Sequence, residues 1–309
     1  MPLYSQGKYI MENFILILLC IVLGYAIQKF HIFSDDAAIT LNQFVIYFSL
    51  PAMILLQIPK LTFSVELIIP IVIAWTVMGL TALITFYVSR WFAFTKEVTG
   101  ALMLVTVLTN SSFMGIPLIS AYMGQKVLPY VLVYDQLGTF FALSIYGTFI
   151  VSYYSHKSEM SAKMIAVKVF TFPPFIALII ALCLMGVEFN DNITKVLSHM
   201  ASTIIPVGLV AVGLQLKLRL TRDELKPFST SLLIKLIVAP LIAIIVAKLF
   251  GWDNEAAQVA ILEAGMAPMV TAGAMASMTG LAPKLSSAIV GYGILFSFLT
   301  TSLLYGLIA

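Results

Sequence analysis

The sequence predicts an all-α membrane protein with ten transmembrane helices, and two observations carry this prediction. Of 309 residues, 61% are hydrophobic and only 10% are charged, whereas soluble domains carry roughly 25% charged residues. Apolar stretches long enough to cross a bilayer recur along the whole chain. Backbone groups find no partner in lipid, and the alternation typical of barrel strands is absent, so the spans should be helices.

The ten predicted spans are joined by short loops, which leaves no room for a sizeable soluble domain. The apolar run from Phe14 to Phe30 follows Lys8, but it is long for a cleavable signal peptide and is interpreted as the first span. The net charge of +3 gives no indication of nucleic-acid binding. The predicted spans cover residues 12–30, 40–58, 65–91, 99–123, 128–153, 165–187, 194–216, 229–250, 255–279 and 285–308.

Lysines and arginines are divided unevenly between the two sides of the predicted membrane. Eleven lie on one side: Lys29, Arg90, Lys96, Lys157, Lys163, Lys168, Lys217, Arg219, Arg222, Lys226 and Lys284. Five lie on the other: Lys8, Lys60, Lys126, Lys195 and Lys248. Cytoplasmic loops are enriched in basic residues, which places both termini outside the cell inner (plasma) membrane. Lys235 falls near the cytoplasmic start of the eighth span, and its ammonium is expected to snorkel to the interface.

The two halves of the chain resemble each other in their prolines. Pro51 and Pro117, in the second and fourth spans, are 66 residues apart, and Pro206 and Pro268, in the seventh and ninth, are 62 apart. Five spans per half is an odd number, so residues 155–309 would repeat residues 1–154 upside down. Interrupted helices at matching positions of inverted repeats indicate a transporter binding site. Chance is the alternative, because 13 prolines form many pairs.

The fourth span carries consecutive polar residues from Thr109 to Ser112, including Asn110 and Ser111, followed by Gly115-Ile116-Pro117. Proline removes a backbone donor and clashes with the preceding turn, so a helix break is expected at Gly115–Pro117. Such a break is tolerated where it is buried in protein or lines a wet cavity. The helix after it would direct its positive end at an anion. Alternatively, these polar side chains join packed helices.

Acidic residues in two later spans are candidates for binding a coupling ion. Glu263 lies five residues, about 7.5 Å of helix, before Pro268 in the ninth span. A carboxyl group inside the membrane indicates function, although one that reaches water or is a protonated hydrogen-bonding group is the alternative. Asp135 and Gln136 lie in the fifth span, where Asp135 is either functional or interfacial. No hydrolase, zinc-protease or phosphate-loop motif occurs, which argues against an enzyme.

These segments resemble the auxin efflux carrier family, in its bacterial type, almost from end to end. The segment from Asn110 to Leu118 is similar to that family's Asn-rich crossover with Gly-Ile-Pro. Leu23-Gly24-Tyr25 and Leu50-Pro51 resemble its first two helices, and the segment from Glu263 to Pro268 resembles its second crossover.

The resemblance implies ten helices in two inverted five-helix repeats, with the fourth and ninth broken and crossed. The first, second, sixth and seventh helices would form a scaffold, through which a homodimer would form, and the others a transport domain. Asn110 and Gln136 match residues that help to hold a substrate carboxylate in the plant carriers. The bile acid sodium symporters share this architecture, and there a glutamate resembling Glu263 helps to bind Na⁺.

The sequence departs from the plant carriers in places. Leu55 replaces a serine of their second helix, so aromatic auxins are not the expected substrate. Glu66 has no following lysine, so the plant carriers' arrangement for supporting the site does not carry over. The expected function is transport of a small mono- or dicarboxylate, such as malate or malonate, by alternating access. Asn110, Ser111 and Gln136 would contact the anion together with Gly115, Pro117 and Pro268, while Glu263 and Asp135 would bind the coupling ion. No cofactor is expected; Na⁺ coupling, H⁺ coupling and facilitated diffusion remain open, as do a sodium-coupled bile-acid carrier and a non-transporting sensor.

Overall fold

The computed structural model describes residues 3–34, 36–60, 65–155, 167, 170–216, 220 and 222–308, with side chains from residue 15 onward. Within these residues every regular element is helical, so the all-α prediction is confirmed. Lys157, Lys163, Lys168, Lys217 and Arg219, which carry part of the charge asymmetry, lie outside the described residues. The chain forms two compact units, which are described separately.

Six helical stretches are long and apolar enough to cross a membrane, by length and composition. They are Ala37–Lys60, Val65–Trp91, Gln125–Tyr154, Asp191–Leu214, Arg222–Leu249 and Pro283–Ile308, and the shorter apolar helices are Ile15–Lys29 and Pro173–Cys183. The predicted fourth and ninth spans are missing from the long stretches because each is interrupted by non-helical backbone, over residues 106–110 and 265–269.

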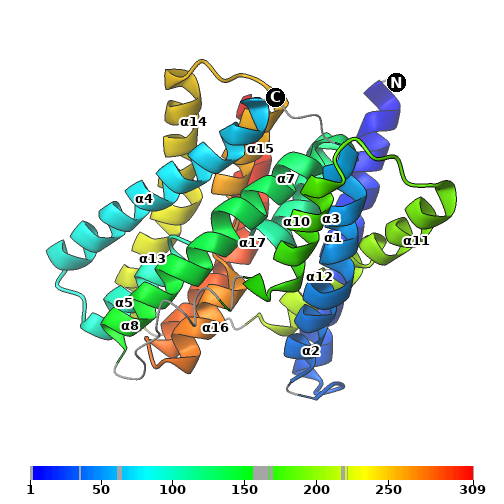
Figure 1. Cartoon of the computed structure of the whole chain (residues 1–309). Coiled ribbons are helices and arrows are strands. Elements are labelled where there is room, and N and C mark those ends of the chain that lie inside the picture. Colours follow the sequence, from blue (N-terminus) through cyan, green and yellow to red (C-terminus); the bar gives the residue numbers. More distant parts are fainter. Residues whose placement is uncertain are drawn as a thin grey trace. The chain divides into compact units, whose positions relative to one another are not determined.

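Unit 1 comprises Met1–Ser64, Ser112–Leu132 and Phe170–Gln215 (Figure 1). Its helices are α1 (Leu3–Lys29), α2 (Ala37–Phe44), α3 (Leu50–Gln57), α6 (Ile116–Met123), α10 (Pro173–Cys183), α11 (Asp191–Ser202) and α12 (Ile204–Leu214). A π-helical turn, η1 (Val45–Ser49), joins α2 to α3, and the short helix α7 (Leu128–Val133) begins in this unit. The hydroxyl groups of Ser49 and Thr203 form a hydrogen bond of 2.6 Å. These residues lie shortly before Pro51 and Pro206.

Unit 2 comprises Val65–Ser111, Val133–Val169 and Leu216–Ala309. Its helices are α4 (Ile68–Trp91), α5 (Lys96–Val105), α8 (Thr148–Tyr154), α13 (Leu225–Leu233), α14 (Ala239–Leu249), α15 (Glu255–Ala264), α16 (Val270–Met278) and α17 (Pro283–Ile308). The π-helical turns η6 (Tyr134–Phe140) and η7 (Leu143–Gly147) precede α8, and η9 (Ile234–Val238) joins α13 to α14.

Three π-helical turns have a common cause in the sequence. Val45–Ser49, Ser111–Gly115 and Ile234–Val238 each end two residues before a proline, namely Pro51, Pro117 and Pro240. Proline has no N–H and its ring clashes with the carbonyl four residues earlier, so the turn before it widens and the helix then continues. In all three cases the proline falls in the first turn of the next α-helix.

Helices α1 and α12 of unit 1 approach closely at two glycines. A Cβ atom built on Gly24 would collide with the Val210 carbonyl oxygen, and one on Gly213 would collide with the Ile21 carbonyl oxygen. Small residues that let helix backbones approach are a common basis of helix association in membranes.

Gly213→Ala is therefore expected to destabilise the protein, because its methyl group would meet backbone that cannot rotate away. Overpacking costs typically about 1–3 kcal/mol, measured as a lower midpoint of thermal unfolding in detergent. Gly79→Ala on α4 is the matched control, because among the described residues no atom beyond its own helix backbone lies within 4 Å of its added Cβ. Equal stability of both variants would contradict this close packing.

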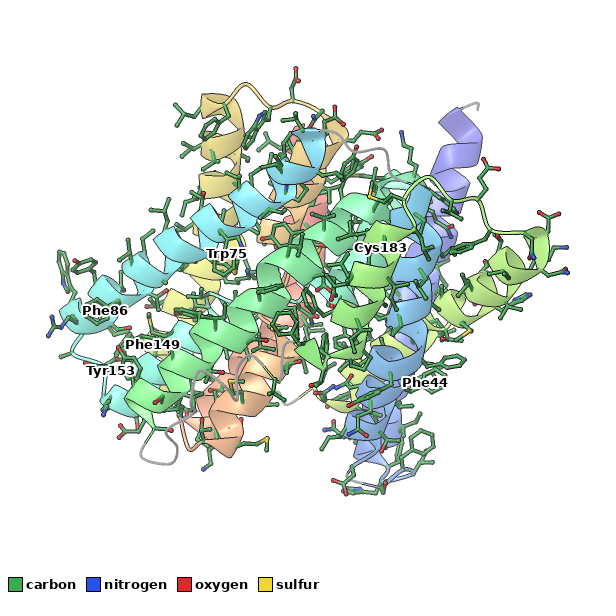
Figure 2. The ribbon with its side chains drawn as sticks, in the orientation of Figure 1. Phe44, Trp75, Phe86, Phe149, Tyr153 and Cys183 are labelled. Carbon is green, nitrogen blue, oxygen red and sulfur yellow. The ribbon has the colours of Figure 1, made fainter. Side chains whose placement is uncertain are left out.

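One end of unit 2 gathers aromatic rings and basic side chains. The Lys96 ammonium lies 5.8 Å from the Tyr153 ring centroid, the Lys226 ammonium lies 4.0 Å from that of Phe92, and the Arg90 guanidinium lies 5.3 Å from that of Phe86. Phe86, Phe149 and Tyr153 are labelled at this end in Figure 2. Aromatic belts and basic residues mark membrane–water interfaces, so the start of α5 and the ends of α4 and α8 indicate one interface.

Candidate functional site

Two helices of unit 2 stop inside the apolar part of the chain. Helix α5 ends at Val105 and α15 ends at Ala264, and each is followed by five non-helical residues. In the second segment Gly265 and Pro268 account for the interruption, since glycine is a poor helix former and proline disfavours helical backbone before it. The Gly265 N–H closes the last turn by donating to the Ile261 and Leu262 carbonyl groups.

The two non-helical segments pair with each other like a short piece of antiparallel sheet. The Asn110 N–H donates to the Ala267 carbonyl, and the Met269 N–H donates to the Leu108 carbonyl, both at 3.0 Å. Thr109 and Pro268 face each other between these bonds as an isolated antiparallel bridge. In such a non-hydrogen-bonded pair a residue needs no N–H toward its partner strand, which is why proline fits there.

We call the paired non-helical segments, residues 106–110 and 265–269, the crossing. A glycine on a neighbouring helix leaves space for it. A Cβ atom on Gly293 of α17 would collide with the ring of Pro268. The crossing is therefore packed directly against the backbone of α17.

Asp135 is the first of three buried charged residues in unit 2. It lies on η6 and is 2% exposed. One carboxylate oxygen accepts a hydrogen bond from the Ser111 hydroxyl and the other accepts one from the Gln136 amide, each at 2.5 Å. Asp135 is thus part of the protein interior.

The turn that carries Asp135 is fixed against α4. The Leu137 carbonyl of η6 accepts a 3.0 Å hydrogen bond from the indole of Trp75, labelled on α4 in Figure 2. Gly138 allows the close approach, because a Cβ atom there would lie 2.7 Å from the Ala74 methyl group. A π-helical turn shifts its side chains relative to an α-helix and is frequent at functional sites.

Glu263 is the second buried charge and the one with the fewest partners. It lies in the last turn of α15 and is fully buried. Neither of its carboxylate oxygens has a hydrogen-bond partner among the residues that the structure describes. Asp135, Lys235 and Tyr134 interact with it electrostatically. The alternative of a glutamate that reaches water is therefore wrong. A buried carboxylate without hydrogen bonds is costly unless a proton or a cation neutralises it.

Lys235 is the third buried charge, and its expected snorkelling is wrong. Its side chain is 1% exposed, and its ammonium donates to the Thr109 hydroxyl and, at 3.4 Å, to the Ala264 carbonyl. The helix that bears it starts at Leu225, earlier than the predicted residue 229, so Lys235 is about 15 Å along it. That distance from the start of the helix exceeds the reach of a lysine side chain. The sequence alone carried no signal for this, because it did not show where the helix begins.

Asn110 offers a hydrogen-bond donor next to Thr109, which Lys235 contacts. Its side chain is 2% exposed, and its amide nitrogen has no hydrogen-bond partner among the described residues. In Gln136 the amide nitrogen is engaged with Asp135, and the unpartnered atom is the carbonyl oxygen. A substrate contact by the Gln136 amide nitrogen would compete with Asp135.

The predicted break at Gly115-Ile116-Pro117 is wrong. Gly115 has helical backbone angles, φ −62° and ψ −52°, and Pro117 lies in the first turn of α6. The widened turn Ser111–Gly115 absorbs the proline, so the interruption falls earlier, at residues 106–110. Gly115 and Pro117 belong to unit 1, whereas Asn110, Ser111, Asp135, Gln136, Glu263 and Pro268 belong to unit 2.

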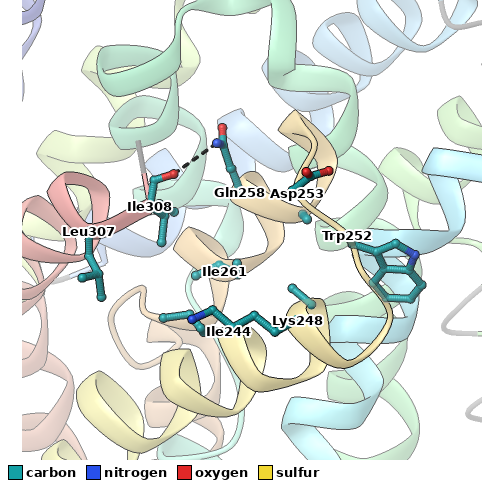
Figure 3. Close-up of a pocket in the computed structure, with 10 residues that line it drawn as sticks. Ile244, Lys248, Trp252, Asp253, Gln258, Ile261, Leu307 and Ile308 are labelled. Carbon is teal, nitrogen blue, oxygen red and sulfur yellow. Dashed lines mark hydrogen bonds between the residues drawn. The ribbon is translucent and has the colours of Figure 1, made fainter.

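A separate cavity of about 300 Å³ lies between α14, α15 and the end of α17 (Figure 3). Lys248, Trp252 and Asp253 line it, and the Gln258 amide donates to the Ile308 carbonyl at 3.2 Å beside it. None of the predicted site residues is among the described residues that line this cavity.

Apolar helices of spanning length, with buried charges around two interrupted ones, define a multi-pass α-helical membrane protein. Residues 9–305 match the sequence profile of the family described as membrane transport protein, and the chain belongs to that family. The resemblance to the auxin efflux carriers is thereby confirmed.

Two archaeal relatives match over nearly the whole length. An uncharacterised transporter of Methanocaldococcus jannaschii is 25% identical over 302 residues, which cover 95% of this chain and 97% of the relative. An uncharacterised transporter of Methanothermobacter thermautotrophicus is 23% identical over 300 residues, which cover 94% of this chain and 96% of the relative.

Proposed function

We propose that this protein is a secondary transporter that moves a small organic anion, a mono- or dicarboxylate such as malate or malonate, across the membrane by alternating access. The observation that carries the proposal is the buried Asn110 amide nitrogen, which has no hydrogen-bond partner among the described residues. The Asn110 N–H bonds to the second non-helical segment, and Lys235 contacts the neighbouring Thr109. An amide N–H donates to a carboxylate without adding charge, and its burial would strengthen the bond.

Each site residue has a proposed role. Asn110 donates to the substrate carboxylate, and Ser111 and Gln136, which donate to Asp135, exchange that partner for the anion. Pro268 shapes the second interruption, and Gly115 and Pro117 are proposed substrate contacts in the segment that follows the first. Glu263, with Asp135, carries the coupling cation.

Charge supports coupling to a cation. Among the described side chains, Asp135, Glu263 and Lys235 are the buried charged residues, with a net charge of −1 if all are ionised. An anion entering such a site would be repelled. One proton on Glu263 leaves Lys235 and Asp135 balanced, so the anion would enter a neutral site.

A thermal-shift screen of the purified protein tests the proposal. Carboxylates are added with and without Na⁺ at several pH values, and a ligand of the folded state raises the apparent stability by mass action. We expect small mono- or dicarboxylates to stabilise the protein, and neutral analogues such as the corresponding amides to have no effect. No stabilisation by any carboxylate would contradict the proposal.

A sodium-coupled symporter of the bile-acid type is the second candidate, and the unpartnered Glu263 carboxylate favours it. Uptake of both substrate classes with and without Na⁺ separates the two candidates. A sensor without transport activity would bind ligand but give no uptake of either class.

For the architecture we propose ten transmembrane helices in two inverted repeats, residues 1–154 and 155–309. The paired interruptions, 106–110 and 265–269, support the repeat. The hydrogen bond between the Ser49 and Thr203 hydroxyl groups, close to Pro51 and Pro206, also supports it. We also propose the scaffold of the first, second, sixth and seventh helices, because unit 1 contains α1–α3 and α10–α12. A homodimer through this scaffold belongs to the same proposal.

For the orientation we propose a cell membrane location with both termini outside. Cysteines introduced at exposed positions of a variant without Cys20 and Cys183 test it with a membrane-impermeant thiol reagent in intact cells. Lys248→Cys should be labelled from outside, and Lys284→Cys should react only after permeabilisation. The opposite pattern would reverse the orientation.

A further inference from the structure

The Lys235 ammonium joins the two crossing segments of unit 2. It donates to the hydroxyl of Thr109, in the first non-helical segment, and to the carbonyl of Ala264, the last helical residue before the second. Ala264 directly follows Glu263 in the chain, and the Lys235 ammonium also interacts electrostatically with the Glu263 carboxyl group. A single positive group thus lies beside oxygen atoms from both interrupted helices.

These oxygen atoms are of the kind that bind a free cation. They comprise a hydroxyl group, a carbonyl at the negative C-terminal end of α15, and the nearby carboxyl group of Glu263, whose oxygens lack hydrogen bonds within the described chain. Hard cations select carboxylate, hydroxyl and carbonyl oxygen. Here the positive charge is supplied by the protein itself.

The chain positions this lysine despite the cost of burying a charge. Lysine is expensive inside a membrane unless it is paired or bonded to backbone carbonyl groups. Lys235 is the only buried lysine or arginine among the side chains that the structure describes. The π-helical turn η9, caused by Pro240, fixes the direction in which its side chain leaves the helix.

We propose that Lys235 is a tethered cation that occupies the position at the helix crossing where a free metal cation would otherwise bind. The consequence for transport is that coupling at this crossing requires no Na⁺, and this consequence alone rests on the proposed function. The occupied position itself is tested without any substrate.

Removing the lysine should convert the crossing into a cation-binding site. In Lys235→Ala the ammonium is gone, while the Thr109 hydroxyl, the Ala264 carbonyl and the Glu263 carboxyl group remain. Asp135 and Glu263 would then carry two negative charges without a buried positive charge, so that a small cation would bind from solution.

The experiment measures the unfolding midpoint of purified protein in detergent at neutral pH, with NaCl, methylammonium chloride or choline chloride at equal ionic strength. For the wild type, Na⁺ and choline should give the same midpoint. Lys235→Ala should unfold at a lower temperature in choline. Na⁺ or methylammonium, at about a hundredfold its dissociation constant, should raise that midpoint saturably by about 5 °C.

Two further variants make the result decisive. Lys248→Ala, which removes an exposed lysine from the same span, should behave as the wild type. The double variant Lys235→Ala/Glu263→Gln should be more stable than Lys235→Ala in choline and respond less to Na⁺, because the carboxylate that needs a cation is also gone.

Three results would overturn the inference. The first is a saturable stabilisation of the wild type by Na⁺, and the second is a Lys235→Ala variant that is as stable as the wild type in choline. The third is a destabilised Lys235→Ala variant that neither cation restores, which would make the lysine only a hydrogen-bond donor. Because no substrate is present, failure of carboxylate binding in the thermal-shift screen would be a separate result.

Discussion

Glu263→Gln is expected to abolish the coupling of transport to a cation while leaving the protein folded. Glutamine has the same shape but can neither release a proton nor supply a negative charge to a cation. The groups that act on Glu263 are Asp135 on η6, Lys235 on η9 and Tyr134 on η6. Since Lys235 already supplies a positive charge at the crossing, the coupling ion is expected to be a proton.

The measurement is substrate accumulation in proteoliposomes with an imposed pH gradient. One pH unit corresponds to about 1.4 kcal/mol, or about tenfold accumulation when one proton crosses with each substrate. The wild type should concentrate the substrate, whereas Glu263→Gln should only equilibrate it. Glu255→Gln, at the exposed start of the same helix, is the matched control and should retain accumulation. A Glu263→Gln variant that still concentrates substrate would assign Glu263 a structural role.

Asn110→Ala is expected to weaken binding of the carboxylate at least tenfold. Losing a hydrogen bond to a charged group costs about 1.5–3 kcal/mol, or roughly 10- to 150-fold in affinity. The stability of the protein without ligand should change little. The Asn110 side-chain nitrogen has no partner to lose in the described chain, and the Asn110 N–H would still donate to the Ala267 carbonyl after the substitution.

The competing interpretation, in which Asn110 joins packed helices, gives the opposite pattern. Loss of such a bond between membrane helices costs about 0.6 kcal/mol on average and would appear as lower stability with nearly normal affinity. Ser297→Ala is the matched control, because this buried hydroxyl bonds only within its own helix in the contacts described, to the Ile294 carbonyl. Unchanged affinity in Asn110→Ala would remove Asn110 from the site.

The burial of the candidate site residues could be predicted from polar residues in apolar spans. Asn110, Ser111, Asp135, Gln136 and Glu263 are all buried in unit 2, as expected for side chains whose burial in a membrane has a functional reason. Pro268 lies in an interruption, as expected for a proline inside a helix. These predictions depended on the residue type and its depth, which a linear sequence contains.

The errors came from geometry that a linear pattern does not contain. Pro117 was expected to break its helix, but the widened turn Ser111–Gly115 before it accommodates the ring. The position of Lys235 depended on where its helix begins and on which oxygens lie opposite. The pairing of Thr109 with Pro268 joins residues that are far apart in the chain, so no local spacing could establish it.

Substrate flux in proteoliposomes is the decisive test of whether this protein transports small carboxylates that Asn110 binds. Purified wild-type protein and the Asn110→Ala variant are reconstituted separately, and uptake of labelled malate and malonate is measured against protein-free vesicles. Uptake by the wild type is expected to be saturable and to be inhibited by other small carboxylates, with an at least tenfold higher half-saturating concentration in Asn110→Ala. Uptake no faster than in protein-free vesicles for every small carboxylate tested, from protein shown to be folded, would contradict this expectation.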